Sequence, residues 1–193
     1  SQSLGKMGLP IWWVGVAWLW FNAAFISFAT FAPNFFLQKG YTIEQSGFLT
    51  GIPLLGSLFL SPLTGILVDR FRHQEWLIGI GGVALSILVL SFNFGASFVL
   101  LVTLMGIFSA TIPAPIYSLP PELLRSEHLG LGFGVISTCS SVGLFVAPYL
   151  VGKAKDMTGS DGFGFAMISM FFLLTVVSIF FVHRRTRQFG VRS

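Results

Sequence analysis

The stretch Gly65-Ile-Leu-Val-Asp-Arg-Phe-Arg72 places a group of charges directly after an apolar run that begins near Gly47. An Asp or Arg at the centre of a bilayer costs about 2.5–3.5 kcal/mol on insertion scales. Asp69, Arg70 and Arg72 therefore belong at or beyond a membrane surface, and we expect a loop there. The sequence on both sides of this loop is strongly apolar.

Composition places the chain among integral membrane proteins. Hydrophobic residues make up 54% of it and charged residues 9%, whereas soluble domains carry about 25% charged residues. The net charge of +4 comes from basic residues that are scattered through short loops and the tail, so no basic face predicts nucleic-acid binding. The single cysteine, Cys139, lies in an apolar run and is interpreted as a packing residue.

Six apolar runs are long enough to cross about 30 Å of hydrocarbon as helices, which takes about 20 residues each. The runs are continuously apolar without a two-residue alternation, which excludes a membrane β-barrel. The sequence thus predicts an all-α integral membrane protein with a single six-helix domain over residues 1–193. The predicted spans are 11–37, 47–68, 76–93, 98–118, 131–152 and 163–182.

The pattern Gly65-x-Leu67-x-Asp69-Arg70 carries a family resemblance. It is similar to the loop between the second and third helices of major facilitator superfamily transporters, which reads roughly Gly-x-Leu-Ala-Asp-Arg-x-Gly-Arg-Lys. The resemblance implies a gating role for this loop on the cytoplasmic side. The match ends after Arg70, because Arg72 stands where the family prefers its second glycine.

Asp69 is the candidate latch within this loop. A carboxylate at the end of one helix can dock on the exposed N–H groups at the start of a neighbouring helix, where the dipole favours negative charge. The alternative is a solvated turn in which Asp69, Arg70 and Arg72 obey the positive-inside bias.

A second resemblance lies in the fifth run. The superfamily's fifth or eleventh helix carries a glycine pattern that ends in Gly-Pro and Gly-Gly, and the run is similar to it, with Ala147 and Val151 at two positions where glycine is usual. The matching residues are Gly134, Gly143, Pro148 and Gly152.

The second and fifth runs end alike, with Pro62-x-x-Gly65-x-x-x-Asp69 against Pro148-x-x-x-Gly152-x-x-x-Asp156. Two three-helix units of opposite orientation are typical of inverted-repeat transporters. We therefore expect a 3+3 inverted-repeat bundle that forms half of the family's twelve-helix fold. The departures in the first loop, the basic tail and the absence of Met at position 1 favour the C-terminal half, although an N-terminal half cut in the central loop would look similar.

Polar and aromatic residues of the first run are candidates for lining a solute cavity. Trp20, Ser27 and Asn34 recur at heptad spacing and Thr30 follows Ser27 by three residues, so all lean to one side of a helix. Trp20 would lie roughly 13 Å into the span at 1.5 Å per residue, deeper than an interfacial anchor. The alternative is a helix contact in which Ser27 and Thr30 bond to their own backbone.

The fourth run adds Thr103 and Tyr117 to these candidates. Four prolines in 113–121 predict that its second half is kinked or ended, and discontinuous helices are typical of transporter sites. The family resemblance implies that the first and fourth helices line the central cavity, so we expect these residues to face it.

These observations favour transport of a small solute by alternating access, as one half of a secondary transporter. The alternatives are a self-sufficient six-helix homodimeric carrier or channel, and a membrane-embedded enzyme or assembly factor. The predicted spans contain no Asp, Glu, His, Lys or Arg, so we expect no catalytic residue, no metal site and no cofactor. The expected partners are the lipid bilayer, a complementary half or second copy, and a small-molecule solute.

The distribution of Lys and Arg predicts the orientation. With a cytoplasmic N-terminus, eight of the eleven Lys and Arg residues fall on the inside, which is the positive-inside bias. We therefore expect both termini in the cytoplasm and a plasma or inner membrane location. The three basic residues on the outside are Lys39, Lys153 and Lys155.

This orientation predicts which sites an impermeant thiol reagent reaches. Cysteines introduced near Lys39 and Lys155 should react in intact cells, whereas cysteines near Arg72, Arg125 and Arg187 should react after permeabilisation. Labelling from outside near Arg72 would contradict both the orientation and the assignment of the loop.

Overall fold

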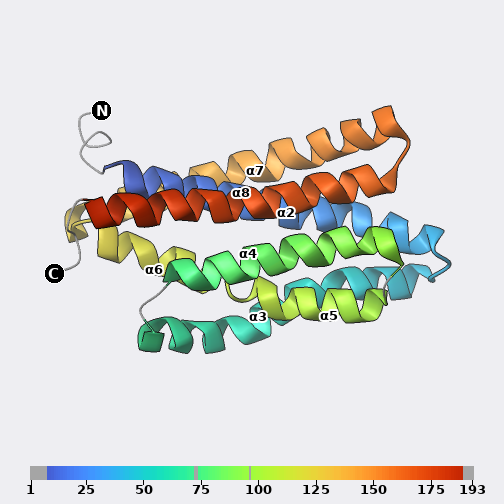
Figure 1. Ribbon diagram of the computed structural model, residues 1–193, viewed down its shortest axis with the longest axis horizontal. Helices are drawn as coiled ribbons and strands as arrows, with labels where there is room; N and C mark the ends of the chain where they lie inside the picture. Colours follow the sequence, from blue (N-terminus) through green and yellow to red (C-terminus); the bar gives the residue numbers. More distant parts are fainter. Residues whose placement is uncertain (1–7, 72–73, 96, 189–193) are drawn as a thin grey trace.

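A computed structural model describes residues 8–71, 74–95 and 97–188, and these residues form helices without a strand. The predicted all-α fold is therefore confirmed (Figure 1). The longer helices are α2 (Leu9–Gln38), α3 (Ile43–Phe71), α4 (Gln74–Ser91), α5 (Phe98–Ser109), α6 (Pro113–Leu123), α7 (Leu129–Thr158) and α8 (Asp161–Gln188). Two short 3-10 turns, η1 (Phe92–Phe94) and η2 (Ser126–His128), lie between them.

Six candidate spans in the described part of the chain are long and apolar enough to cross a membrane. The first, second and sixth spans are single α-helices, and the third and fifth add the short turns η1 and η2 to α4 and α7. The fourth consists of α5 and α6, which are separated at residues 110–112. Pro113 and Pro115 start α6 and lack the N–H groups that would continue α5, so the predicted break in this span is confirmed. Pro33, by contrast, lies inside a continuous α2.

The helices pack in an order that follows an internal repeat. α2 packs mainly on α7 and α8, while α5 packs mainly on α3 and α4. The first helix of each three-helix unit thus contacts the second and third helices of the other unit, as the inverted repeat requires. This confirms the architecture of one half of a major facilitator fold.

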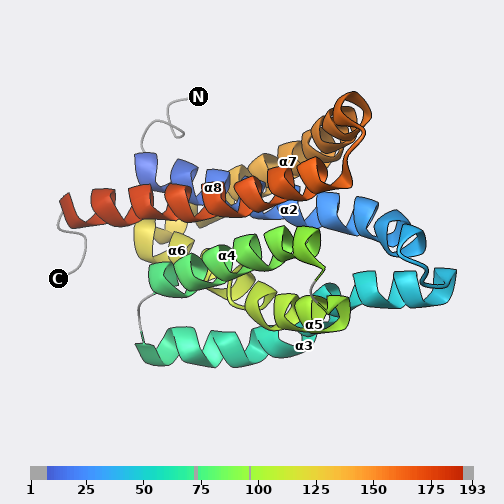
Figure 2. The same cartoon turned by 45° about the vertical axis from the view of Figure 1, so that its right-hand side comes forward.

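Two helices lie at opposite edges of the bundle. Figures 1 and 2 both show α7 along one edge and α3 along the other, with α2, α8 and α4 between them. These edge helices bury less of their apolar length than the others, 17% in the α3 span and 28% in the α7 span, against 39–50% elsewhere. Much of their apolar surface is therefore left without a partner inside this six-helix unit.

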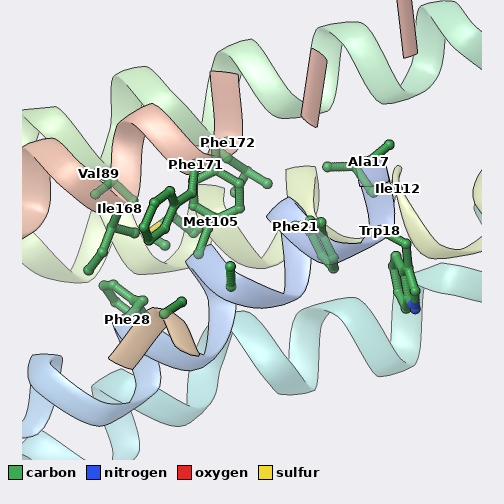
Figure 3. Close-up of a cluster of buried hydrophobic side chains, with 14 of the residues drawn as sticks. Ala17, Trp18, Phe21, Phe28, Val89, Met105, Ile112, Ile168, Phe171 and Phe172 are labelled. Carbon is green, nitrogen blue, oxygen red and sulfur yellow. The ribbon is translucent and has the colours of Figure 1, made fainter. Parts of the chain in front are cut away.

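Buried side chains from both units form one core. α2 contributes Trp18, Phe21 and Phe28, which join Met105 of α5 and Phe172 of α8 in this core, with Trp18 beside Ile112 (Figure 3). At the end of the bundle where α2 ends and α8 begins, the core consists mainly of aromatic rings. Phe35 and Phe165 meet there with ring centroids 4.8 Å apart. Phe92 and Phe98 also stack there, and the edge-to-face geometry of several of these pairs adds to the packing energy.

Glycine allows the closest helix approaches. A methyl group at Gly56 of α3 would lie 2.6 Å from the Cα of Gly106 in α5, and one at Gly143 of α7 would lie 2.5 Å from the carbonyl oxygen of Leu19 in α2. The two contacts are α3 with α5 and α2 with α7, which are equivalent pairs in the repeat. Small residues permit such contacts where lipid offers no hydrophobic driving force between helices.

We predict that Gly56→Ala lowers the stability of the full-length protein, because the new methyl group must push the backbone of α5 away. Overpacking of this kind costs about 1–3 kcal/mol. The measurement is the thermal unfolding midpoint of purified protein in detergent. Gly79→Ala is the matched control, since a methyl group there has no atom within 4 Å. Equal midpoints for the two variants would contradict the close contact.

Candidate functional site

One side of α2 is left open by the other helices of this unit. Asn22 and Ile26 are half-buried there, and Thr30 and Asn34 are exposed. These four residues follow one another at four-residue steps, so they form a stripe that turns slowly around the helix. We call this stripe, Asn22 to Asn34, the open face of α2.

Two polar groups of the open face bond to their own helix. Asn22 Nδ2 donates to the carbonyl oxygen of Trp18 at 2.8 Å, and Thr30 Oγ1 donates to that of Ile26 at 2.8 Å. The carboxamide of Asn22 keeps one N–H and its carbonyl oxygen available, and the Thr30 hydroxyl keeps its lone pairs. The face therefore offers neutral groups that can both donate and accept hydrogen bonds.

The structure separates the heptad residues that the sequence grouped together. Trp20 stacks on Phe171 of α8, with ring centroids 5.5 Å apart, and Trp13 stacks on Phe181 of the same helix. Ser27, one heptad after Trp20, is fully buried and its hydroxyl has no hydrogen-bond partner. Trp20 thus lies on the α8 side of α2 and Ser27 is buried within the bundle, while Thr30 and Asn34 are exposed on the open face. A role for Trp20 or Ser27 in lining a cavity stays a prediction.

An aromatic cluster adjoins the open face. Tyr117 in α6 is 42% exposed; its ring meets that of Trp18 in an edge-to-face arrangement with centroids 5.3 Å apart and stacks on Phe133 of α7 with centroids 6.2 Å apart. Asn22 lies beside this cluster, because its side chain donates a hydrogen bond to the carbonyl oxygen of Trp18. We define the aromatic cluster as Trp18, Tyr117 and Phe133, which come from three helices. The sequence identified Tyr117 but missed Asn22, since a single Asn in an apolar run marks no periodic face.

Thr103 stands apart from this arrangement. It is exposed on α5, and its hydroxyl donates to the carbonyl oxygen of Val99 at 2.7 Å. The break at residues 110–112 lies between Thr103 and Tyr117, so one straight helical face does not join them. Its contact with a solute stays a prediction.

The glycine pattern of the fifth span divides between packing and surface. A methyl group at Gly143 would meet the α2 backbone and one at Gly152 would meet the ring of Phe31, whereas one at Gly134 would meet no atom within 4 Å. Pro148 is half-buried within a continuous α7. On the same exposed side as Gly134, Thr138 and Ser141 donate their hydroxyls to their own helix backbone.

The charged stretch that ends the second span lies in the last turns of α3, which runs to Phe71. The helix therefore continues past the position where the sequence predicted a loop. Gly65 has open space around its Cα and Arg70 is exposed. The side chain of Asp69 and all of Arg72 lie outside the described residues, so the latch and the gating role stay predictions.

Ionic contacts of the described residues lie at the ends of the bundle. Lys155 of α7 pairs with Asp161 of α8 at 2.5 Å, and its ammonium lies 4.9 Å from the centre of the Phe31 ring. Arg125 and Glu127 form an exposed pair, and His183 of α8 faces Glu75 of α4. No group of three His, Cys, Asp or Glu side chains that could hold a metal ion occurs among the described residues.

The fold defines a class of protein: an all-helical integral membrane protein whose described residues form six spans long and apolar enough to cross a membrane. The family model of the Major Facilitator Superfamily matches residues 13–191. The chain belongs to the Major Facilitator Superfamily.

Individual relatives are distant but consistent with this family. The chain is 25% identical to a probable nitrate transporter of Staphylococcus epidermidis over 88% of its length, and 25% identical to a nitrite extrusion protein of Bacillus subtilis over 92%. It is 27% identical to a D-galactonate transporter of Escherichia coli over 77%. These matches cover 44%, 46% and 34% of the relatives, so the chain spans less than half of their length.

We predict that Trp20→Ala lowers stability more than Asn34→Ala does, because the Trp20 ring packs on Phe171 while Asn34 is exposed. The loss for Trp20→Ala should be on the order of 2 kcal/mol, since part of the ring is already uncovered. Thermal unfolding of the two purified variants measures this. Equal losses would contradict the division of α2 into a packed side and an open face.

Proposed function

We propose that this chain is one half of a secondary transporter that moves a small polar solute across the membrane by alternating access. The observation that supports it is the open face of α2 beside the aromatic cluster, which gives a six-helix membrane bundle a polar surface at mid-span. In the family such surfaces from two halves enclose the solute between them.

The complementary half would cover the edge helices α3 and α7. Their exposed apolar side chains include Leu58, Phe59 and Ile66 on α3 and Phe145 and Tyr149 on α7. The relatives are more than twice as long as the matched segment, which leaves room for a second bundle of this size. We infer that this half pairs with such a bundle along both edges, with the open face of α2 between them.

The solute would meet neutral groups on this half. Asn22 and Asn34 supply carboxamides, Thr30 supplies a hydroxyl oxygen and Tyr117 supplies a phenol, with aromatic rings for apolar contact. The relatives are named for nitrate, nitrite and D-galactonate, so small anions are the first solutes to test. A fixed positive charge for an anion, or a carboxylate for proton coupling, would come from the complementary half or from helix ends.

We also propose that the end of the bundle where α2 begins and α8 ends faces the cytoplasm of a plasma or inner membrane. The excess of Lys and Arg at this end supports that orientation. We call it the inner end.

The test is transport by the full-length protein in proteoliposomes. We expect uptake of at least one of nitrate, nitrite and D-galactonate under a proton or sodium gradient. Asn22→Ala and Tyr117→Phe should each raise the apparent KM for that solute by roughly 5- to 50-fold, the effect of about 1–2.3 kcal/mol from a lost hydrogen bond at 1.4 kcal/mol per tenfold. Their unfolding midpoints should change little.

Ser91→Ala is the control for these variants, because its hydroxyl bonds only to the backbone of Ile87 at the end of α4. It should keep the wild-type KM. The proposal would be wrong if no gradient drives uptake of any solute in the panel. It would also be wrong if the Asn22 and Tyr117 variants lose stability while the KM of the surviving protein stays unchanged.

A further inference from the structure

Two of the outer helices, α4 and α8, lie side by side and run in opposite directions (Figures 1 and 2). Ser86 and Ser169 share a hydrogen bond of 2.7 Å in the middle of the two helices. At the inner end, Oε1 of Glu75 lies 3.5 Å from Nδ1 of His183. These pairs mark the line along which the two helices face each other.

One side of this helix pair is an exposed apolar surface. A residue that follows a contact residue is turned by about 100° around its helix, and because the helices are antiparallel, this turn carries the residues of both helices to the same side of the pair. The apolar residues on that side are 41–58% exposed, and they include Ile80, Val83 and Ile87 of α4 and Leu173, Val177 and Phe180 of α8. We call this surface the α4–α8 face. The proposed second bundle would cover α3 and α7, so lipid is left to cover this face.

A tryptophan and an arginine stand at the inner end of the α4–α8 face. Trp76 follows Glu75 and is 65% exposed, and Arg184 follows His183 and is exposed as well. The guanidinium carbon of Arg184 lies 4.6 Å from the centre of the Phe180 ring, which is a cation–π distance. No carboxylate among the described residues forms an ion pair with Arg184. The N–H groups in the plane of this guanidinium can therefore bind another partner.

The nearby carboxylates do not lie on this face. Glu75 is buried, with 7% of its surface exposed. Glu122 of α6 accepts a hydrogen bond from Gln74, which lies about 200° around α4 from Trp76 and thus on the opposite side of the helix. The exposed corner formed by the tryptophan and the arginine is therefore positively charged.

The chemistry of this corner matches the phosphate of an anionic phospholipid. A guanidinium binds phosphate through paired N–H groups, and an indole adds one N–H donor at the membrane surface, where tryptophan is enriched. After Arg184 the sequence continues with Arg185 and Arg187, and basic residues that follow a span are attracted to anionic lipid. The acyl chains of a lipid held here would lie along the α4–α8 face, a contact that free phosphate cannot make.

We propose that Trp76, Phe180 and Arg184 form a headgroup site for an anionic phospholipid whose acyl chains cover the α4–α8 face. Arg184 binds the phosphate, Trp76 donates a hydrogen bond to it, and the ring of Phe180 holds the guanidinium in place. A zwitterionic lipid carries the same phosphate, but the basic run repels its cation, so the site prefers a lipid of net negative charge. The site is on different helices from the open face of α2, so it does not depend on which solute the transporter carries.

Photolabelling of the full-length protein in phosphatidylcholine nanodiscs tests this site. The probes are phosphatidylglycerol and phosphatidylcholine that carry the same diazirine near the headgroup end of one acyl chain, and mass spectrometry locates the labelled residues. In the wild type, the phosphatidylglycerol probe should label residues 80–83 and 177–181 at least fivefold more than the phosphatidylcholine probe does. We call this quotient the headgroup ratio.

Two substitutions should lower the headgroup ratio. Arg184→Gln should lower it about fivefold, which corresponds to the roughly 1 kcal/mol of one basic residue near an anionic surface at 1.4 kcal/mol per tenfold. Trp76→Phe keeps an aromatic ring but loses the N–H donor, so it should lower the ratio about threefold. Both side chains are exposed, and the unfolding midpoints of these variants should match that of the wild type.

Arg125→Gln is the matched control, because Arg125 is an exposed arginine at the same end of the bundle that pairs with Glu127. It removes the same charge and should keep the wild-type headgroup ratio. An excess of inorganic phosphate, at an ionic strength matched with chloride, should also leave the ratio unchanged. The lipid site is ruled out if the two probes label the wild type equally or if Arg184→Gln keeps the ratio. It is also ruled out if Arg125→Gln lowers the ratio as much, which would indicate net charge alone, or if phosphate displaces the probe, which would indicate a site for a free anion.

Discussion

Backbone hydrogen bonding in lipid is the constraint on which the rest of this structure depends. Lipid offers no partner for a free N–H or C=O, so each span must close its hydrogen bonds within a helix. The break between α5 and α6 fits this rule, because prolines remove donors there and the hydroxyl of Thr64 in α3 donates to the carbonyl oxygen of Ala110 at the break. Interruption of a span is thus tolerated where neighbouring helices replace the missing bonds.

The same constraint decides what polar side chains can do inside the membrane. Thr30, Thr103, Thr138 and Ser141 all donate to a carbonyl four residues earlier in their own helix. The donors of such hydroxyls are satisfied within their own helix, so these side chains cost little free energy to place in a span. Side chains with more hydrogen-bonding groups than their own helix can satisfy point more clearly to a binding surface. The carboxamides of Asn22 and Asn34 and the phenol of Tyr117 are of this kind. They lie at or near the surface that other helices leave open.

The sequence was sufficient for the fold because long apolar runs and the repeated Pro-Gly-Asp spacing depend on local pattern. The site was less predictable. Two heptads offset Trp20 and Asn34 by only about 40° around an α-helix, so their spacing alone does not decide which of the two is covered by a neighbouring helix. Their separation became visible with the position of α8, which covers Trp20 through Phe171. Similarly, no local pattern pairs Glu75 with His183, because the contact depends on how the third and sixth spans lie together.

The internal repeat also places close helix contacts at equivalent positions in the two three-helix units. The two glycine contacts, Gly56 with Gly106 and Gly143 with Leu19, bring equivalent helix pairs so close that even a methyl group at Gly56 or Gly143 would meet the backbone of the neighbouring helix. Polar contacts join α4 and the turn η1 that follows it to α8, at the middle and at both ends. Helices joined in this way move together more readily than they move apart. The edges formed by α3 and α7 bury less of their apolar length than the other spans. Under the proposed function, the sliding surfaces between two halves would therefore lie along these edges, and their movement would expose or enclose the open face of α2.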